Sequence, residues 1–151
     1  EEYNVYCVLS YPQNNKKYIS QVVSYGEQLF GDRFYPLTTF SPYEEYMGML
    51  SKIDIAIFNN NRQQALGNIA SLLFYGKKVF VNPMNGCLDY FLKMGAHLYS
   101  TNDLSKELIL KEESKCFKIE NQKNILKFYS DVSFTERWEK IFESEYEMET
   151  N

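Results

Sequence analysis

The feature that most constrains the fold is a regular alternation of short apolar runs with stretches of helical periodicity. Runs rich in β-branched and aromatic residues, which favour strands, occupy 5–10, 33–40, 54–58, 77–82 and 96–100. Apolar residues recur at helical spacing in the intervening segments 15–31, 41–52, 66–76 and 87–95. Parallel strands need long, usually helical crossovers. The order therefore predicts an α/β fold, with a doubly wound, Rossmann-like five-stranded parallel sheet between two layers of helices.

The pattern changes in the last quarter of the chain. Two further helices are predicted there, over 121–130 and 133–148, from the spacing of their apolar residues. We expect Trp138, Ile141 and Phe142 to pack this tail on the body of the domain.

The length and composition fit a single folded domain. A chain of 151 residues can bury a core of its own, and 44% apolar and 17% aromatic residues exclude a disordered polypeptide. We predict a Rossmann-like core over 1–110 and a C-terminal helical extension of the same domain over 111–151. The net charge of −4, without a block of Lys or Arg, makes nucleic acid an unexpected partner.

The cysteines indicate a reducing compartment, and the hydropathy indicates no membrane span. Cys7, Cys87 and Cys116 form no CxxC or Cys/His spacing, so reduced thiols in the cytoplasm are expected, and neither a disulfide scaffold nor a zinc site. No apolar stretch reaches the roughly 18 to 20 residues that a membrane span requires.

The candidate binding site is the set of loops that follow the predicted strands. Ligands of open α/β sheets bind beyond the carboxyl ends of the strands. The loops there read "YPQNN", "NNNRQQALGN", "NPMNG" and "STND", which are rich in amides and hydroxyls and poor in carboxylates. This composition suits a phosphate-bearing ligand better than a metal cluster.

The second of these loops carries the strongest signal. If a helix starts near Arg62, the backbone N–H groups of Arg62, Gln63 and Gln64 are free to bind an anion, which the helix dipole favours. Arg62 can add a bidentate contact to a phosphate, and Gly67 leaves space for close approach. The alternative is an ordinary amide-rich loop with a solvated arginine.

Other familiar signatures are absent from the sequence. It contains no GxGxxG, no GxxxxGK[ST] and no DxD, so a dinucleotide enzyme, a P-loop ATPase and a metal-dependent sugar transferase are not supported. His97, the single histidine, lies in a predicted strand without a nucleophile motif nearby, which favours a core or supporting role over catalysis. No catalytic residue can be assigned.

Three blocks of the sequence carry a family resemblance. "YPQNNKKYISQVVSYGEQLFG", "PYEEYMGMLSKIDIAIF", and "NRQQALGNI" with "GKKVF" resemble blocks of the 4-alpha-L-fucosyltransferase family. These are bacterial TDP-N-acetylfucosamine:lipid II N-acetylfucosaminyltransferases of enterobacterial common antigen synthesis. The resemblance spans roughly residues 5 to 105, and its most specific part is the "RQQ…G" block.

The resemblance implies a GT-B glycosyltransferase, in which two Rossmann-like domains face a cleft, and this chain is similar to the C-terminal, donor-binding half. It implies a TDP- or UDP-sugar as ligand, with no metal or other cofactor. Arg62, Gln63, Gln64 and Gly67 match the family block and would contact the diphosphate-sugar, and Tyr11 and Asn14 or Asn15 match the first loop. The full candidate donor-binding set is Tyr11, Asn14, Asn61, Arg62, Gln63, Gln64, Gly67, Asn68 and Asn85.

The chain departs from the family in what it lacks. We expect the acceptor domain and the first strand of the donor domain to be missing, which leaves the strand order 2-1-3-4-5, or pairing across the gap in a swapped form or homodimer. A lipid-linked acceptor would then bind through the missing domain, on a parent enzyme peripheral to the inner face of the inner membrane. The isolated chain would be inactive. The alternative function is a non-enzymatic, flavodoxin-like interaction module.

Overall fold

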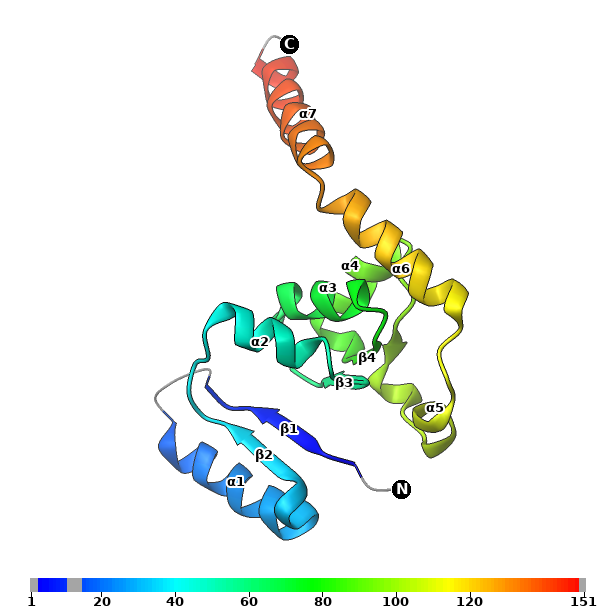
Figure 1. Cartoon of the computed structure of the whole chain (residues 1–151). Helices are drawn as coiled ribbons and strands as arrows, with labels where there is room; N and C mark the ends of the chain where they lie inside the picture. The colour runs from blue at the N-terminus through cyan, green and yellow to red at the C-terminus, as the bar shows by residue number, and fades with distance from the viewer. Residues whose placement is uncertain (1–2, 11–14, 150–151) are drawn as a thin grey trace. The chain divides into compact units, whose positions relative to one another are not determined.

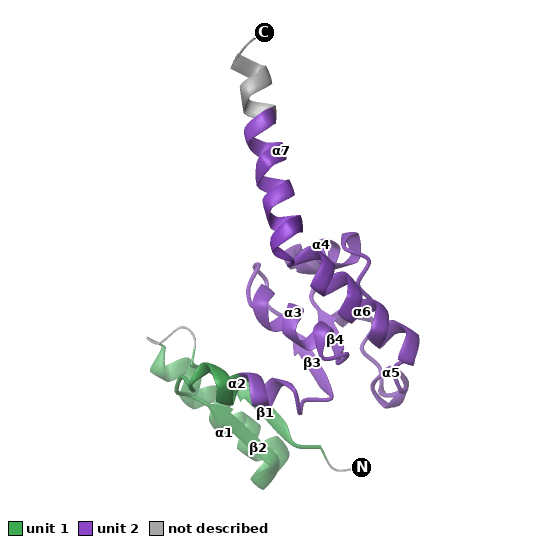
Figure 2. Cartoon of the chain, turned by 45° about the horizontal axis from the view of Figure 1, so that its top comes forward, with its two compact units in different colours: residues 1–46 green, residues 47–151 purple. Residues whose placement is uncertain are grey.

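The structure, a computed structural model, describes residues 3–10 and 15–149, and the side chains of these as far as 143. The chain forms two compact units, Glu1–Tyr46 and Met47–Asn151, which Figure 2 colours separately. We refer to them as unit 1 and unit 2 and describe each by itself.

Unit 1 is a strand, helix, strand motif (Figure 1). Strand β1 (Val5–Val8) pairs in parallel with β2 (Phe34–Leu37), and helix α1 (Lys16–Phe30), followed by the short η1 (Gly31–Arg33), makes the crossover. The register places Val5 opposite Phe34. A parallel pair of strands needs such a crossover, so the observed helix satisfies the sequence prediction.

Helix α1 begins and ends where its sequence predicts. The Asn15 side chain accepts a hydrogen bond from the Tyr18 backbone N–H at 3.0 Å, which satisfies one of the free donors of the first turn. Gly31, with a φ of 56°, ends the helix in a conformation that costs glycine least.

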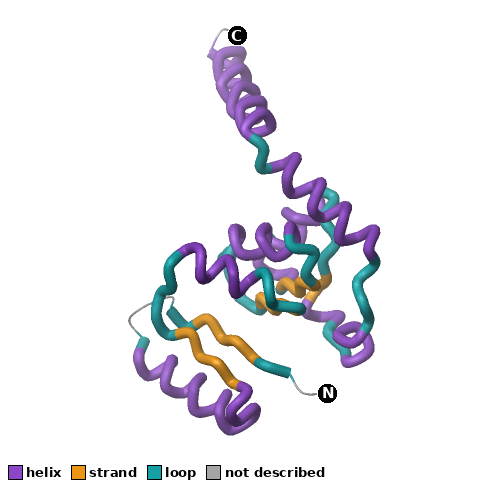
Figure 3. The backbone as a smooth tube through the Cα atoms, viewed as in Figure 1, coloured by secondary structure: helices purple, strands orange, loops and turns teal. Residues whose placement is uncertain are grey.

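Unit 2 is built on a second parallel sheet, of order β3-β4-β5, whose strands are orange in Figure 3. Helix α2 (Tyr43–Leu50) spans the unit boundary and precedes it. The further elements are β3 (Ile55–Phe58), α3 (Leu66–Phe74), β4 (Lys78–Val81), η2 (Pro83–Asn85), α4 (Cys87–Lys93), β5 (Tyr99–Ser100), η3 (Thr101–Asp103), α5 (Lys106–Leu110), α6 (Lys115–Phe128) and α7 (Asp131–Glu149).

The core of unit 2 surrounds β4, whose four side chains are all buried. Leu73 of α3 and Phe91 of α4 are fully buried, as are Val79 and Phe80 of the strand itself. A strand that is apolar on both faces is typical of the centre of a parallel sheet covered by helices. Helix α6 packs against α3 and buries Ile125.

The prediction of one five-stranded sheet is wrong, because the described strands form sheets of two and three strands. The neighbours expected within each sheet are present, and all of them run parallel. Those neighbours are consecutive strands joined by a single crossover. The missing ladder, between β1 and β3, would have joined strands that are not consecutive, and local periodicity carries no information on such a pairing.

The predicted packing of the tail is also wrong in its second half. Trp138, Ile141 and Phe142 are 46%, 47% and 64% exposed. One contact of α7 with α6 is made by Arg137, whose guanidinium lies 3.9 Å from the centroid of the Phe128 ring. Among the described residues, no helix is long and apolar enough to cross a membrane.

Candidate functional site

The loops at the carboxyl ends of β3, β4 and β5 are held together by amide side chains. Asn82 donates to the Asn61 side-chain oxygen at 3.4 Å, and Thr101 donates to the Asn59 side-chain oxygen at the same distance. The three loops therefore form one connected edge, as expected for neighbouring parallel strands. Asn59 and Thr101 were not in the predicted set, although both lie in the polar loops that defined it.

Asn85 anchors this edge from inside. Its side chain donates from Nδ2 to the Asn60 carbonyl at 2.9 Å, and its Oδ1 accepts from the Cys87 backbone N–H at 2.9 Å. The residue is buried, and both ends of its amide form hydrogen bonds within the chain, as is usual for buried polar groups. Asn85 thus fixes the loop that follows β3 against the start of α4.

Helix α3 begins later than predicted. The expected start near Arg62 is wrong, since the first helical residue is Leu66 and the residue before it, Ala65, has a φ of 60°. Ala65 makes no side-chain cap, so within the described part of the chain no cap side chain accepts from the first N–H groups of the helix, those of Leu66 and Gly67. The sequence signal failed here because the amides looked like capping residues, but an alanine occupies the cap.

The start of α3 faces open space. A Cβ atom added at Gly67 would meet no heavy atom within 4 Å, and Gly67 is exposed. Ala65 is the one described residue other than glycine with a positive φ, a conformation that costs a non-glycine residue on the order of 1 kcal/mol or more. Strain of this kind often accompanies a binding loop.

Arg62 and Gln64 lie together beside this helix start. With the Gln64 amide turned so that its oxygen faces the arginine, that oxygen accepts from Arg62 Nε at 3.1 Å and from Nη2 at 3.3 Å. Both side chains are exposed, as is Gln63. A neutral acceptor thus holds the guanidinium near the start of α3. Two of its five N–H donors face Gln64, which leaves three that can bind an anion.

Of the predicted set, the structure brings together Asn61, Arg62, Gln64 and Asn85, and it places Gly67 and Asn68 in the first turn of α3. Tyr11 and Asn14 lie outside the described residues. Asn15, the alternative to Asn14, caps α1 in unit 1.

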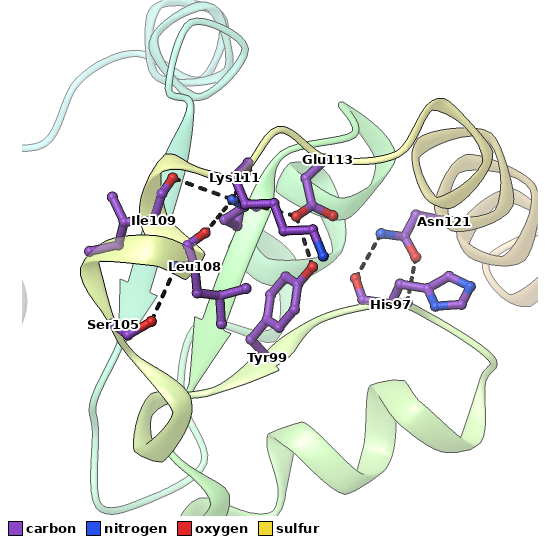
Figure 4. Close-up of polar contacts among 9 residues, drawn as sticks. His97, Tyr99, Ser105, Leu108, Ile109, Lys111, Glu113 and Asn121 are labelled. Atoms are coloured by element: carbon purple, nitrogen blue, oxygen red, sulfur yellow. Dashed lines mark hydrogen bonds and ion pairs between the residues drawn. The ribbon is translucent and has the colours of Figure 1, made fainter.

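A second polar cluster lies at the opposite, amino end of the sheet (Figure 4). Lys78 is 4% exposed, and its Nζ donates to the carbonyls of Leu108 at 2.6 Å, Ile109 at 3.3 Å and Lys111. These carbonyls end α5, so the lysine caps that helix. A pocket beside it is lined by Lys77 among others.

Glu113 completes the Lys78 cluster. Its carboxylate lies 3.6 Å from Lys78 Nζ and accepts from the Tyr99 hydroxyl at 2.9 Å. Burial, together with this hydrogen bond to a carboxylate, raises the pKa of Tyr99 to about 12. Lys78 and Glu113 are thus paired with each other and with neighbouring groups, which indicates a structural role.

His97 joins α6 to the segment before β5. Its Nε2 lies 2.6 Å from Glu120 Oε2, and its ring stacks on Phe117 with 4.1 Å between centroids. Asn121 holds the His97 backbone, accepting from the N–H at 2.6 Å and donating to the carbonyl at 2.9 Å. β5 begins only at Tyr99, so the placement of His97 within a strand was wrong, but these contacts agree with a supporting role.

Comparison with known proteins gives one clear relationship. The family model of the 4-alpha-L-fucosyltransferases, glycosyl transferase group 56, matches residues 1–146. The match contains every predicted site residue, all of unit 1 and unit 2 as far as residue 146, and it extends into the tail beyond the blocks that first carried the resemblance. No solved structure matches the chain.

Proposed function

Because the chain belongs to the 4-alpha-L-fucosyltransferase family, a family of glycosyltransferases, we propose that it binds the sugar donor of such a transferase. The donor would be a nucleotide diphosphate-sugar, of the TDP or UDP type, carrying an amino-deoxyhexose or a similar sugar. The acceptor would be a lipid-linked glycan of the bacterial cell envelope. Membership of an enzyme family disfavours the alternative of a non-enzymatic interaction module.

One observation carries this proposal, the uncapped and open N-terminus of α3 beside Arg62. A helix N-terminus has partial positive charge and free N–H donors, and phosphates bind to such ends in many nucleotide sites. The open space in front of Gly67 allows a phosphate to reach the backbone. Arg62 stands beside it with a guanidinium that can hold two phosphate oxygens at once.

The same arrangement supports the chemistry of transfer. When the sugar leaves, negative charge develops on the terminal phosphate of the nucleotide. The α3 N–H groups and Arg62 would be oriented before the reaction, so they would stabilise this charge more than they stabilise the bound donor. In the GT-B organisation that the resemblance implies, a second Rossmann-like domain would supply the acceptor and the catalytic base, and the isolated chain would bind donor without turning it over.

Titration with dTDP and with UDP tests the proposal. We expect backbone amide resonances of 58–68 in ¹⁵N-labelled protein to shift, and Arg62→Gln to weaken binding by about tenfold, as befits one charged phosphate contact. Lys52→Gln removes the same charge from an exposed position after α2 and should leave affinity unchanged. Absence of any shift at millimolar nucleotide, or equal effects of the two variants, would refute the site.

A further inference from the structure

Helix α7 presents an apolar stripe that is exposed among the described residues. Phe134, Trp138 and Phe142 follow one another at single-turn spacing and are 56%, 46% and 64% exposed. Their rings contact each other along the helix, with centroids 6.1 and 5.8 Å apart. A continuous exposed aromatic surface of this kind marks an interaction site.

The charges around this stripe limit what can cover it. The α7 sequence carries seven carboxylates against Arg137 and Lys140. A second α7 would bring like charges together, which is unfavourable along packed helices, and an anionic surface is disfavoured for the same reason. The partner of α7 should therefore be an apolar surface flanked by basic side chains.

The outer face of α6 has these properties. Ile119 and Leu126, one above the other on that face, are 52% and 57% exposed. Lys115, Lys123 and Lys127 are exposed around them. The opposite face, with Ile125, packs on α3, so the outer face is available to a second molecule.

We propose that two copies of this chain associate through their α6 and α7 helices, with α7 of each copy lying antiparallel along α6 of the other. This goes beyond the donor-binding function and does not depend on it. The contact is isologous, since each copy contributes one acidic and one basic helix, and it closes as a dimer.

The register supports this arrangement. Helix α7 runs on from the end of α6 and does not fold back along it (Figures 1 and 3). A two-fold axis at Ser130 pairs positions equally distant from that residue. Leu126 and Phe134 are each four residues from it, and Ile119 and Ile141 are each eleven residues away, so these two pairs of exposed apolar residues coincide, while Trp138 falls opposite Gln122.

The size of the contact sets its strength. Helices of 14 and 19 residues form a strip roughly 50 Å long and about 10 Å wide, or about 1,000 Å² in total for the two copies. This is at the lower limit for a specific interface, so a dissociation constant on the order of micromolar is expected.

Sedimentation velocity of the full chain at increasing concentration tests the dimer. The chain should pass from monomer to dimer, and emission of Trp138, the single tryptophan, should shift to the blue in parallel. Leu126→Ser should weaken association by about tenfold or more. Leu29→Ser, in α1, truncates a leucine of the same exposure and should have no effect. A chain that is monomeric throughout overturns the proposal, as does equal weakening by both variants.

Charge exchange tests the pairing of unlike helices. Position 145 is as far from Ser130 as Lys115 is, so Lys115→Glu should weaken the dimer about tenfold, and so should Glu145→Lys, while the two together should restore it. Circular dichroism of each variant confirms that the helices are folded. Stronger association of the Glu145→Lys variant alone would show that two α7 helices pair with each other and would overturn the proposal.

A disulfide tests the register. Position 144 is as far from Ser130 as Cys116 is, so Ser144→Cys should cross-link to Cys116 of the second copy under mild oxidation. Mass spectrometry of the linked peptides identifies the bond, and Cys116→Ser should abolish it. A link between the two residues at position 144 contradicts the antiparallel pairing of α6 with α7.

Discussion

At the scale of single residues, the Tyr99 hydroxyl illustrates how a buried ion pair imposes its charge on a neighbour. Glu113 is held by Lys78, and its carboxylate accepts from the Tyr99 hydroxyl. The neutral phenol donates to the carboxylate, whereas a phenolate would repel it. Burial disfavours the phenolate most, and Glu113 adds to that effect, so the pKa of Tyr99 rises to about 12 from an ordinary value near 10.

This shift predicts a loss of stability in alkali. Because the folded pKa is the higher one, the contribution of Tyr99 is fully present below about pH 10 and is lost as the pH rises toward about 12. Tyr99→Phe should remove this part of the pH dependence of the free energy of unfolding.

Ultraviolet absorbance titration of the folded protein measures the Tyr99 pKa by difference from Tyr99→Phe. Tyr43→Phe serves as the control, because Tyr43 is 76% exposed. A Tyr99 difference curve that coincides with the control curve would contradict the paired geometry.

Single residues also show where sequence reasoning about the site succeeded and failed. Position after a strand identified the loop that holds Arg62 and Gln64, because the carboxyl edge of a parallel sheet is set by the order of its elements. The start of α3 was misplaced, since Ala65 has no side chain that marks a cap and alanine rarely adopts the left-handed conformation found there. The turn sequence around Asn85 suggests an exposed side chain, so the sequence does not show that this side chain is buried and bonds within the chain.

At the scale of elements, α1 meets β2 through a glycine. A Cβ atom at Gly26 would lie 2.3 Å from the Phe34 ring, and Phe34 is buried, so the helix and the strand approach as closely as they do only because the side chain is absent. Gly48 in α2 is the opposite case, since a Cβ there would meet no heavy atom within 4 Å.

The two glycines predict opposite effects of the same substitution. Gly26→Ala should lower the free energy of unfolding by about 1 to 3 kcal/mol, because the Phe34 ring or the helix must move. Gly48→Ala should raise it by about 0.5 to 1 kcal/mol, the usual gain in a helix interior. Urea denaturation followed by circular dichroism compares both with the parent. A Gly26→Ala variant as stable as the parent would show that the contact is not rigid.

Elements were predicted best where a local pattern determines them. The helices α1, α3 and α4 and the strands β1 to β4 all lie within predicted segments, because periodicity and turn residues act over a few positions. The fifth strand was predicted over 96–100 and is only Tyr99–Ser100, since Asn121 takes the backbone groups of His97. A side chain 24 residues away leaves no mark on the local pattern.

At the scale of the whole molecule, burial is distributed unequally between the units. The large side chains that are fully buried, which include Phe80, Phe91 and Leu73, all belong to unit 2. In unit 1 the most buried apolar residues, Leu9 and Phe34, retain 6% and 9% of their exposure. Periodicity predicts strands and helices in both units alike, so this difference was not visible in the sequence.

Unequal burial predicts unequal opening of the two units. The Leu9 N–H bonds to the Leu37 carbonyl in unit 1, and the Asn82 N–H bonds to the Phe58 carbonyl in unit 2, both at 2.8 Å. Since the bonds match, any difference in their protection reports the local opening free energy. We expect the Leu9 amide to exchange on the order of a hundredfold faster, because fewer apolar contacts must break. Hydrogen exchange followed by NMR measures both amides in one sample, and equal protection would mean that the units unfold as one cooperative body.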